Sequence, residues 1–103
     1  MKCGGTNSIT VTDEIRAMCK NHLPEIQSHS QKHGRNGLID DYEVVDALSQ
    51  VVAGVNYYLN IKVLSSTDEH IWVRIHEDLE GKSHLHAVQV GKAGSDVITY
   101  FED

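Results

Sequence analysis

The chain has 103 residues, of which 40% are hydrophobic and 23% charged, and its formal net charge is −6 at pH 7. This length is typical of one domain, here residues 1–103, with a modest core and little room for the deep, enclosed site of an enzyme. The acidic balance disfavours nucleic acid and anionic membrane surfaces as partners, because both attract clustered Lys and Arg.

The N-terminal segment Met1–Val11 is polar and contains two glycines. It lacks the apolar stretch of a secretory signal, and no run in the chain approaches the roughly 20 apolar residues of a membrane-spanning helix. A disulfide between Cys3 and Cys19 would constrain almost none of the fold, so we expect two free thiols. For Cys3, a redox-sensitive thiol and an ordinary exposed residue are both open. These features predict a cytoplasmic protein.

One amphipathic helix is predicted to begin after Thr12 or Asp13, either of which can cap its N-terminus. Pro24 removes a backbone donor and predicts a kink or an early end. Residues 28–38 carry Ser, His, Gly and Asn without periodicity, so we expect a frayed helix end followed by a loop. The apolar positions that follow a 3.6-residue period are Ile15, Met18, Cys19, Leu23 and Ile26.

Strand-like runs fill the remainder of the chain, and their apolar residues alternate with polar ones. This alternation predicts a sheet with one buried face and one wet face, with Trp72 partly exposed on the wet side. The single helix is the only available cover for the buried face. We therefore expect an α+β fold, in which an antiparallel sheet of about five strands wraps around one α-helix. The runs are 42–48, 57–63, 71–75, 85–90 and 97–101.

A short apolar turn, Gln50-Val51-Val52-Ala53-Gly54, joins the first two of these runs. Hairpin turns usually carry Asn, Asp or Ser, since a turn in water gains nothing from exposed valines. An exposed apolar patch indicates a partner that buries it, and a narrow loop suits a cleft better than a flat surface.

At this turn the chain resembles the cystatins, whose first hairpin carries the pattern Gln-x-Val-x-Gly, here Gln50, Val52 and Gly54. Met1–Gly5 is similar to the glycine-bearing N-terminal arm of the stefins, the intracellular type 1 cystatins, and Ile98–Phe101 is similar to their C-terminal ending. The secreted cystatins carry disulfides in their C-terminal half, where this chain has no cysteine. The resemblance is therefore to the stefin branch.

The resemblance implies a reversible, tight-binding competitive inhibitor of papain-like cysteine proteases of the cathepsin L, H or B type. In that family, an N-terminal arm and two hairpin loops occlude the active-site cleft without any chemical step. A monomer is implied, although exchange of a hairpin strand could form a dimer. The protease-binding residues carried over to this sequence are Gly4, Gly5, Gln50, Val51, Val52, Ala53, Gly54, Leu79, Glu80 and Gly81.

The second hairpin departs from the family pattern, because Leu79-Glu80 stands where stefins commonly have Leu-Pro. Losing the ring raises the entropy cost of ordering the loop by about 0.4–1 kcal/mol. The charge of Glu80 can attract or repel the rim of an enzyme, so this loop is expected to tune selectivity. A simple solvent-exposed turn is the alternative reading of the same residues.

Other function classes have weaker support in the sequence. No nucleophile elbow, phosphate-binding glycine loop or catalytic carboxylate pair occurs at a usable spacing, so we expect neither an enzyme nor a cofactor. The histidine pairs His29/His33 and His84/His86 lack neighbouring ligands that would complete a metal site. The competing hypothesis is a non-inhibitory protein-binding module on the same scaffold.

Overall fold

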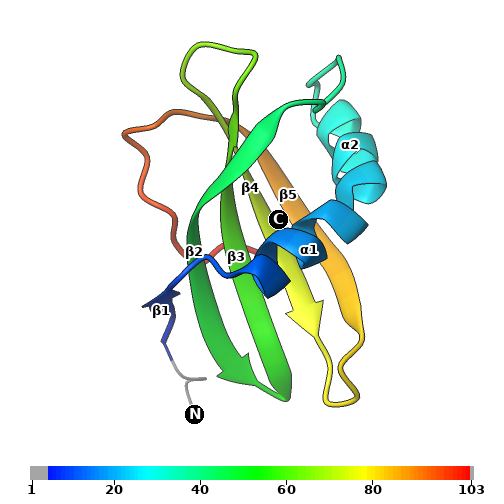
Figure 1. Cartoon of the computed structure of the whole chain (residues 1–103), viewed down its shortest axis with the longest axis vertical. Coiled ribbons are helices and arrows are strands. Elements are labelled where there is room, and N and C mark those ends of the chain that lie inside the picture. Colours follow the sequence, from blue (N-terminus) through cyan, green and yellow to red (C-terminus); the bar gives the residue numbers. More distant parts are fainter. Residues whose placement is uncertain (1–4, 103) are drawn as a thin grey trace.

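The computed structural model describes residues 5–102 and forms an α+β fold. Two helices lie across one face of a five-stranded antiparallel sheet, in which the strands follow chain order (Figure 1). This architecture confirms the expected fold class. Cys3 and Gly4 lie outside the described residues. The elements are β1 (Asn7–Ile9), α1 (Asp13–Asn21), α2 (Leu23–Lys32), β2 (Tyr42–Val52), β3 (Gly54–Val63), β4 (Glu69–Glu77) and β5 (Ser83–Lys92).

The helical region consists of two helices, where the sequence predicted one helix with a kink or an early end at Pro24; the first helix does end early, at Asn21, and a second one follows it. Thr12, one of the two candidate caps, caps α1, because its Oγ1 accepts a hydrogen bond from the N–H of Ile15 at 3.3 Å. His22 then separates the helices, and Pro24 lies in the first turn of α2, where a missing N–H costs nothing. The proline therefore lies at the start of a second helix, which the sequence pattern did not predict.

Helix α2 ends at Lys32, so residues 28–38 hold a helix end followed by a loop, as expected, but the helix is regular up to Lys32 and not frayed. Ile26 and Ser30 share the face that packs on the sheet and are fully buried, whereas most of the polar residues around them point to solvent. Packing against β5 thus stabilises a segment with weak intrinsic periodicity. In the described part of the chain, neither helix is long and apolar enough to cross a membrane.

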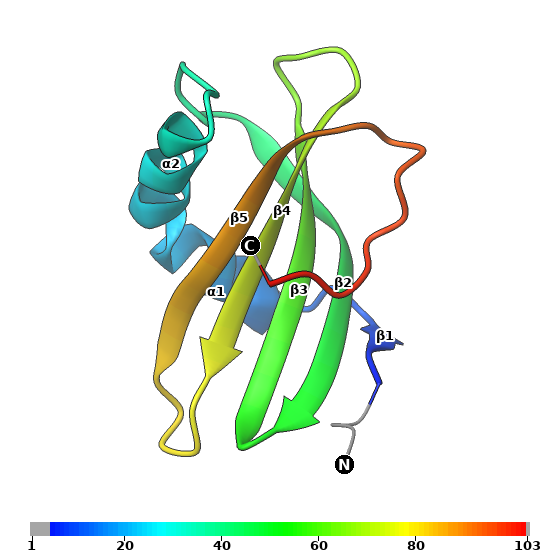
Figure 2. The same cartoon turned by 180° about the vertical axis from the view of Figure 1, so that it is seen from behind.

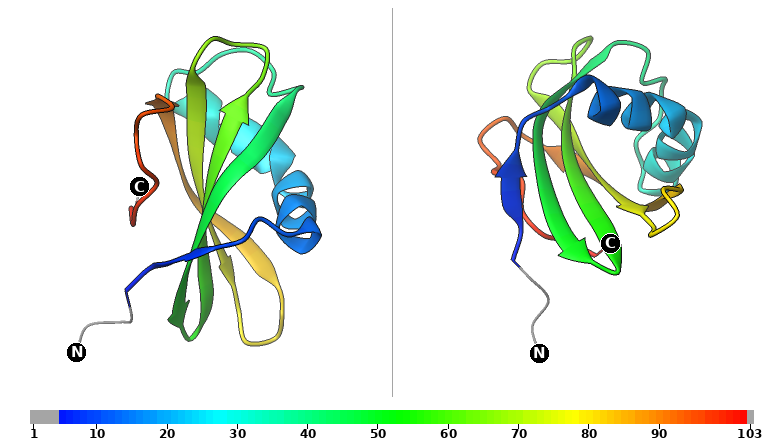
Figure 3. Two further views of the ribbon diagram at one scale, coloured as in Figure 1. Left: turned by 60° about the vertical axis from the view of Figure 1, so that its left-hand side comes forward. Right: turned by 60° about the horizontal axis from the view of Figure 1, so that its bottom comes forward.

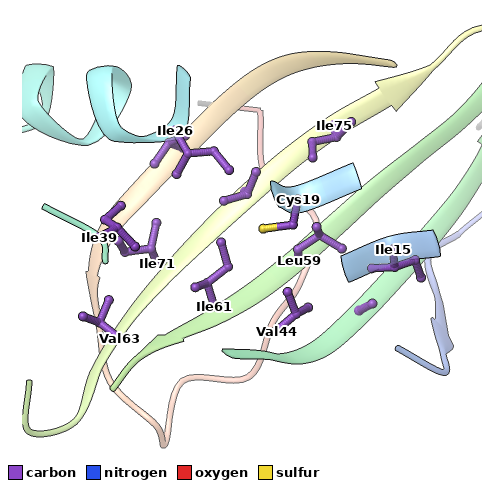
Figure 4. Packing of buried hydrophobic residues seen from close by; sticks show 13 residues of the cluster. Ile15, Cys19, Ile26, Ile39, Val44, Leu59, Ile61, Val63, Ile71 and Ile75 are labelled. Atoms are coloured by element: carbon purple, nitrogen blue, oxygen red, sulfur yellow. The ribbon is translucent and has the colours of Figure 1, made fainter. Parts of the chain in front are cut away.

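The main core lies between the helices and the sheet (Figure 4). Ile15, Cys19 and Ile26 from the helices meet alternate side chains of the central strands, among them Leu59 and Ile61. The predicted alternation of β3 and β4 is confirmed on this face. Cys19 is a free, fully buried cysteine, and burial raises the pKa of its thiol to about 12. The thiol is thus neutral and unreactive at physiological pH.

The opposite face of the sheet is covered in part, so the expectation of a wet face with a partly exposed Trp72 was wrong for the covered region. Tyr58 and Trp72 are buried there beneath Phe101, whose ring centroid lies 5.8 Å from that of Tyr58 and 6.1 Å from that of Trp72. The C-terminal segment crosses this face, as Figure 2 shows. It brings in Ile98 and Phe101 to form a second apolar cluster with the strands.

Residues 97–101 do not form the expected final strand. Their buried residues, Ile98 and Phe101, are three positions apart and do not follow the period of two that a strand requires. The segment is attached by ring packing and by Arg74, whose Nη1 donates to the Phe101 carbonyl oxygen at 3.1 Å. The fifth strand is instead β1, a polar three-residue segment that pairs with Ala47–Ser49 of β2 and that was not predicted from the sequence.

Replacing Phe101 by Ala should therefore lower the free energy of unfolding by about 3–5 kcal/mol, since the buried ring packs on both Tyr58 and Trp72. Thr99→Ala, at an exposed position of the same segment, is the matched control and should have little effect. Urea denaturation followed by tryptophan fluorescence measures both. Equal stability of the two variants would show that the packing of Phe101 on the sheet does not contribute to the free energy of unfolding.

Candidate functional site

Two hairpin turns lie side by side at one end of the sheet (Figure 1). The first connects β2 to β3 and closes at the pair Val52 and Gly54, while the second connects β4 to β5 and closes at the pair Glu77 and Ser83. Strand β1 runs antiparallel to β2 with Asn7 opposite Ser49, so the described chain enters from the same end, as Figure 3 shows. Gly5, two residues before Asn7, is exposed at this end.

The first turn is as apolar and as exposed as the sequence predicts. Val51 is 69% exposed, Ala53 is exposed and Val52 is half-buried. Ala53 alone separates the two strands, so the chain reverses within a very short connection. Gly54 makes this reversal with φ of +96°, a conformation that favours glycine.

Gly54 also fixes the first turn against the second one. A Cβ atom at this position would overlap the backbone carbonyl oxygen of Glu77 and would lie 3.1 Å from the Cα atom of Asp78. The two turns therefore touch through backbone atoms, and only glycine permits this close approach. As a result, the first turn and the start of the second loop form one packed unit.

Gln50 lies beneath the exposed turn and is buried. Its Oε1 accepts hydrogen bonds from Asn56 Nδ2 at 3.1 Å and from the Tyr58 hydroxyl at 2.9 Å. Asn56 Oδ1 in turn pairs with Nδ1 of His76 on β4 at 2.8 Å. The first residue of the Gln-x-Val-x-Gly pattern thus belongs to a hydrogen-bonded network that ties three strands together below the turn.

The second loop presents Leu79, which is 82% exposed, together with exposed Glu80 and Gly81. Asp78 organises it. Its Oδ1 accepts hydrogen bonds from the N–H groups of Glu80 and Lys82, both at 2.9 Å. The hydrogen bond from the Lys82 N–H is the main cause that lowers the pKa of Asp78.

Asp78 was not among the residues predicted from the sequence, although an Asp three residues before a Gly is a usual turn signal. Nine of the ten candidate residues are described, and all nine lie in or beside the two turns and β1. Eight of them are exposed or half-buried at this end of the sheet, whereas Gln50 is buried beneath the first turn. Within residues 5–102, no group of three or more His, Cys, Asp or Glu side chains is arranged to hold a metal ion.

No family model matches the chain, but individual relatives identify its family. Its sequence is 31% identical to cystatin-B of Oplegnathus fasciatus over 98% of both chains. It is 37% identical to cystatin-A of Mus musculus, over 95% of this chain and 96% of the relative. Cystatin-A2 of Dictyostelium discoideum is 35% identical, over 89% of this chain and 84% of the relative.

The chain belongs to the stefins, the type 1 cystatins. Membership of this family agrees with the expectation that the protein is not an enzyme. In this stefin, the residues of the Gln-x-Val-x-Gly pattern have separable structural positions. Val51 to Ala53 lie at the surface, Gly54 provides the contact between the turns, and Gln50 lies in the network below.

Gly54→Ala should lower the free energy of unfolding of this stefin by about 2–4 kcal/mol, because backbone overlap adds to the strain of a positive φ. Gly37→Ala is the matched control. Gly37 has a nearly identical φ of +95°, but a methyl group there would meet no other part of the chain within 4 Å, so only the conformational cost of about 1 kcal/mol applies. Denaturant unfolding compares the two, and equal losses would contradict a tight contact at Gly54.

Proposed function

We propose that this stefin is a reversible, tight-binding competitive inhibitor of papain-like cysteine proteases of the cathepsin L, H or B type. The N-terminal arm with Gly4 and Gly5 and the two hairpin turns would enter the active-site cleft together. The family supports this proposal, since the relatives that match almost the whole chain are cystatins.

The observation that carries the proposal is a pair of turns held in mutual contact, each of which exposes an apolar side chain. Val51 and Leu79 expose apolar side chains on neighbouring turns, and Gly54 locks one turn against the backbone of the other. A rigid edge of this kind loses little conformational freedom on binding, and preorganisation of this sort raises affinity. Burial of each larger apolar side chain in a cleft contributes about 1.5–3 kcal/mol.

Inhibition would occur by occlusion and would involve no chemical step. The turn residues Val51 to Gly54 would displace water from the apolar cleft, and the glycines of the arm would let its backbone approach the catalytic cysteine without a side-chain clash. Leu79 would add a further contact from the second loop, with Glu80 and Gly81 beside it. Because no covalent bond forms, the complex would dissociate to intact inhibitor and enzyme.

Gln50 would act from below the contact surface. Its amide accepts two hydrogen bonds from β3, and the network continues through Asn56 to His76. Buried networks with satisfied partners rigidify the elements that they join. We therefore assign Gln50 the role of holding the hairpin in shape and Val51–Gly54 the role of contact. The protein would act as a cytoplasmic monomer formed by the single domain 1–103.

Val51→Asp tests the proposal most directly, since the side chain is 69% exposed and the substitution should leave folding intact. Placing a charge in the apolar cleft should weaken inhibition of papain and of a cathepsin L-type protease by about tenfold or more. The measurement is the steady-state inhibition constant of the purified monomer.

The matched control is Leu38→Asp. Leu38 is similarly exposed, at 73%, but it lies in the α2–β2 connection, at the end of the sheet opposite the two turns. This variant should inhibit like the unmodified protein. A folded monomer that fails to inhibit at micromolar concentration would refute the proposal and favour a non-inhibitory binding module.

A further inference from the structure

We propose that Asp78 is the positioning residue of the second loop, and that its carboxylate does the work of the proline that stefins commonly carry at position 80. Through the turn that it holds, Asp78 presents Leu79 to the protease. This inference rests on the proposed inhibitory function. It adds a residue outside the Gln-x-Val-x-Gly pattern, and one that would touch no enzyme atom itself.

The backbone of the loop defines the type of turn. The Gly81 N–H donates to the Asp78 carbonyl oxygen at 3.0 Å, and the Asp78 N–H donates to the Lys82 carbonyl oxygen at 2.8 Å. Gly81 has φ of +87°, whereas Leu79 and Glu80 are not among the residues with positive φ. This is a three-residue hairpin connection, in which a type I turn is followed by a glycine in the left-handed region. Asp is favoured at the first position of such a turn.

The Asp78 side chain closes the loop from within. Oδ1 accepts from the N–H groups of Glu80 and Lys82, and Oδ2 pairs with Nε2 of His84 on β5 at 3.2 Å. These three hydrogen bonds connect Asp78, at the start of the loop, to its tip, its end and the following strand. Because the hydrogen bonds lower its pKa, Asp78 remains an ionised acceptor at neutral and mildly acidic pH.

Proline at position 80 is incompatible with this arrangement. Glu80 contributes a backbone N–H to Asp78, and proline has none. Proline is also disfavoured at the third position of a type I turn, where Glu80 lies. A ring at position 80 and a carboxylate at position 78 are therefore alternative ways to order the same loop. In this chain, the Glu80 side chain is exposed and its main-chain donor performs the structural role.

Asp78 also lies where the two turns meet. Its Cα atom is one of those that a Cβ on Gly54 would crowd. The residue that shapes the second loop thus belongs to the backbone contact that fixes the first turn. A change in the conformation of Asp78 would alter the position of Leu79 relative to Val51, and hence the fit of both to one cleft.

The first test compares Asp78→Ala with Asp78→Asn. Alanine removes the acceptor, whereas asparagine keeps an Oδ1 that can bind both N–H groups and is equally favoured at this turn position. Asp78→Ala should raise the inhibition constant for papain by roughly three- to tenfold, and Asp78→Asn by less than about twofold. Equal losses in the two variants would overturn the proposal, because they would show that the charge acts on the enzyme directly.

The second test is a double-mutant cycle with Leu79→Ala. If Asp78 acts by presenting Leu79, adding Asp78→Ala to Leu79→Ala should weaken inhibition by less than about twofold further. Fully additive losses would overturn the positioning role.

Amide hydrogen exchange of Glu80 and Lys82 in the free protein keeps this inference separate from the proposed function. Asp78→Ala should speed exchange at both amides by about fivefold or more, and Asp78→Asn should preserve their protection. If the unmodified chain inhibits no protease, the proposed function fails, and the exchange data still decide whether Asp78 holds the loop. Unchanged exchange in Asp78→Ala would overturn the inference even in an active inhibitor.

Discussion

The close approach of Gly54 to the backbone of Glu77 and Asp78 is the contact on which the candidate site depends. Two hairpin turns at one end of a sheet would otherwise move independently, and each would lose its own conformational freedom on binding. Backbone-to-backbone contact leaves no side-chain rotamer through which the turns could shift. The exposed side chains of Val51 and Leu79 thus lie on two turns that are fixed relative to each other.

The sheet behind these turns is packed on both sides, and this supports its rigidity. Helices α1 and α2 cover one face with aliphatic side chains, and Phe101 covers part of the other with an aromatic cluster. Toward the turns, the second face becomes polar, and Gln50, Asn56 and His76 form a hydrogen-bonded network there. Tyr58 belongs both to the aromatic cluster and to this network, because its hydroxyl donates to Gln50. The packed region therefore continues from the aromatic cluster to the base of the first hairpin.

Order in the second loop arises from electrostatics and hydrogen bonding in place of a rigid ring. The loss of proline at Glu80 predicted a less ordered loop. The structure adds a carboxylate at Asp78 that binds two backbone N–H groups and the His84 side chain. A proline at position 80 would remove the N–H that Glu80 donates to Asp78. This hydrogen-bonded network therefore requires a residue other than proline at position 80.

Features that depend on local patterns could be predicted from the amino-acid sequence. These include a helix cap at Thr12 or Asp13, the alternation of apolar residues in β3 and β4, and the apolar turn with its glycine, because periodicity and turn chemistry act between near neighbours. The three-dimensional structure was needed to show what covers Trp72, why residues 97–101 do not join the sheet, and how Gly54 meets Asp78. Each of these depends on contacts between segments far apart in the chain, which a local pattern does not encode.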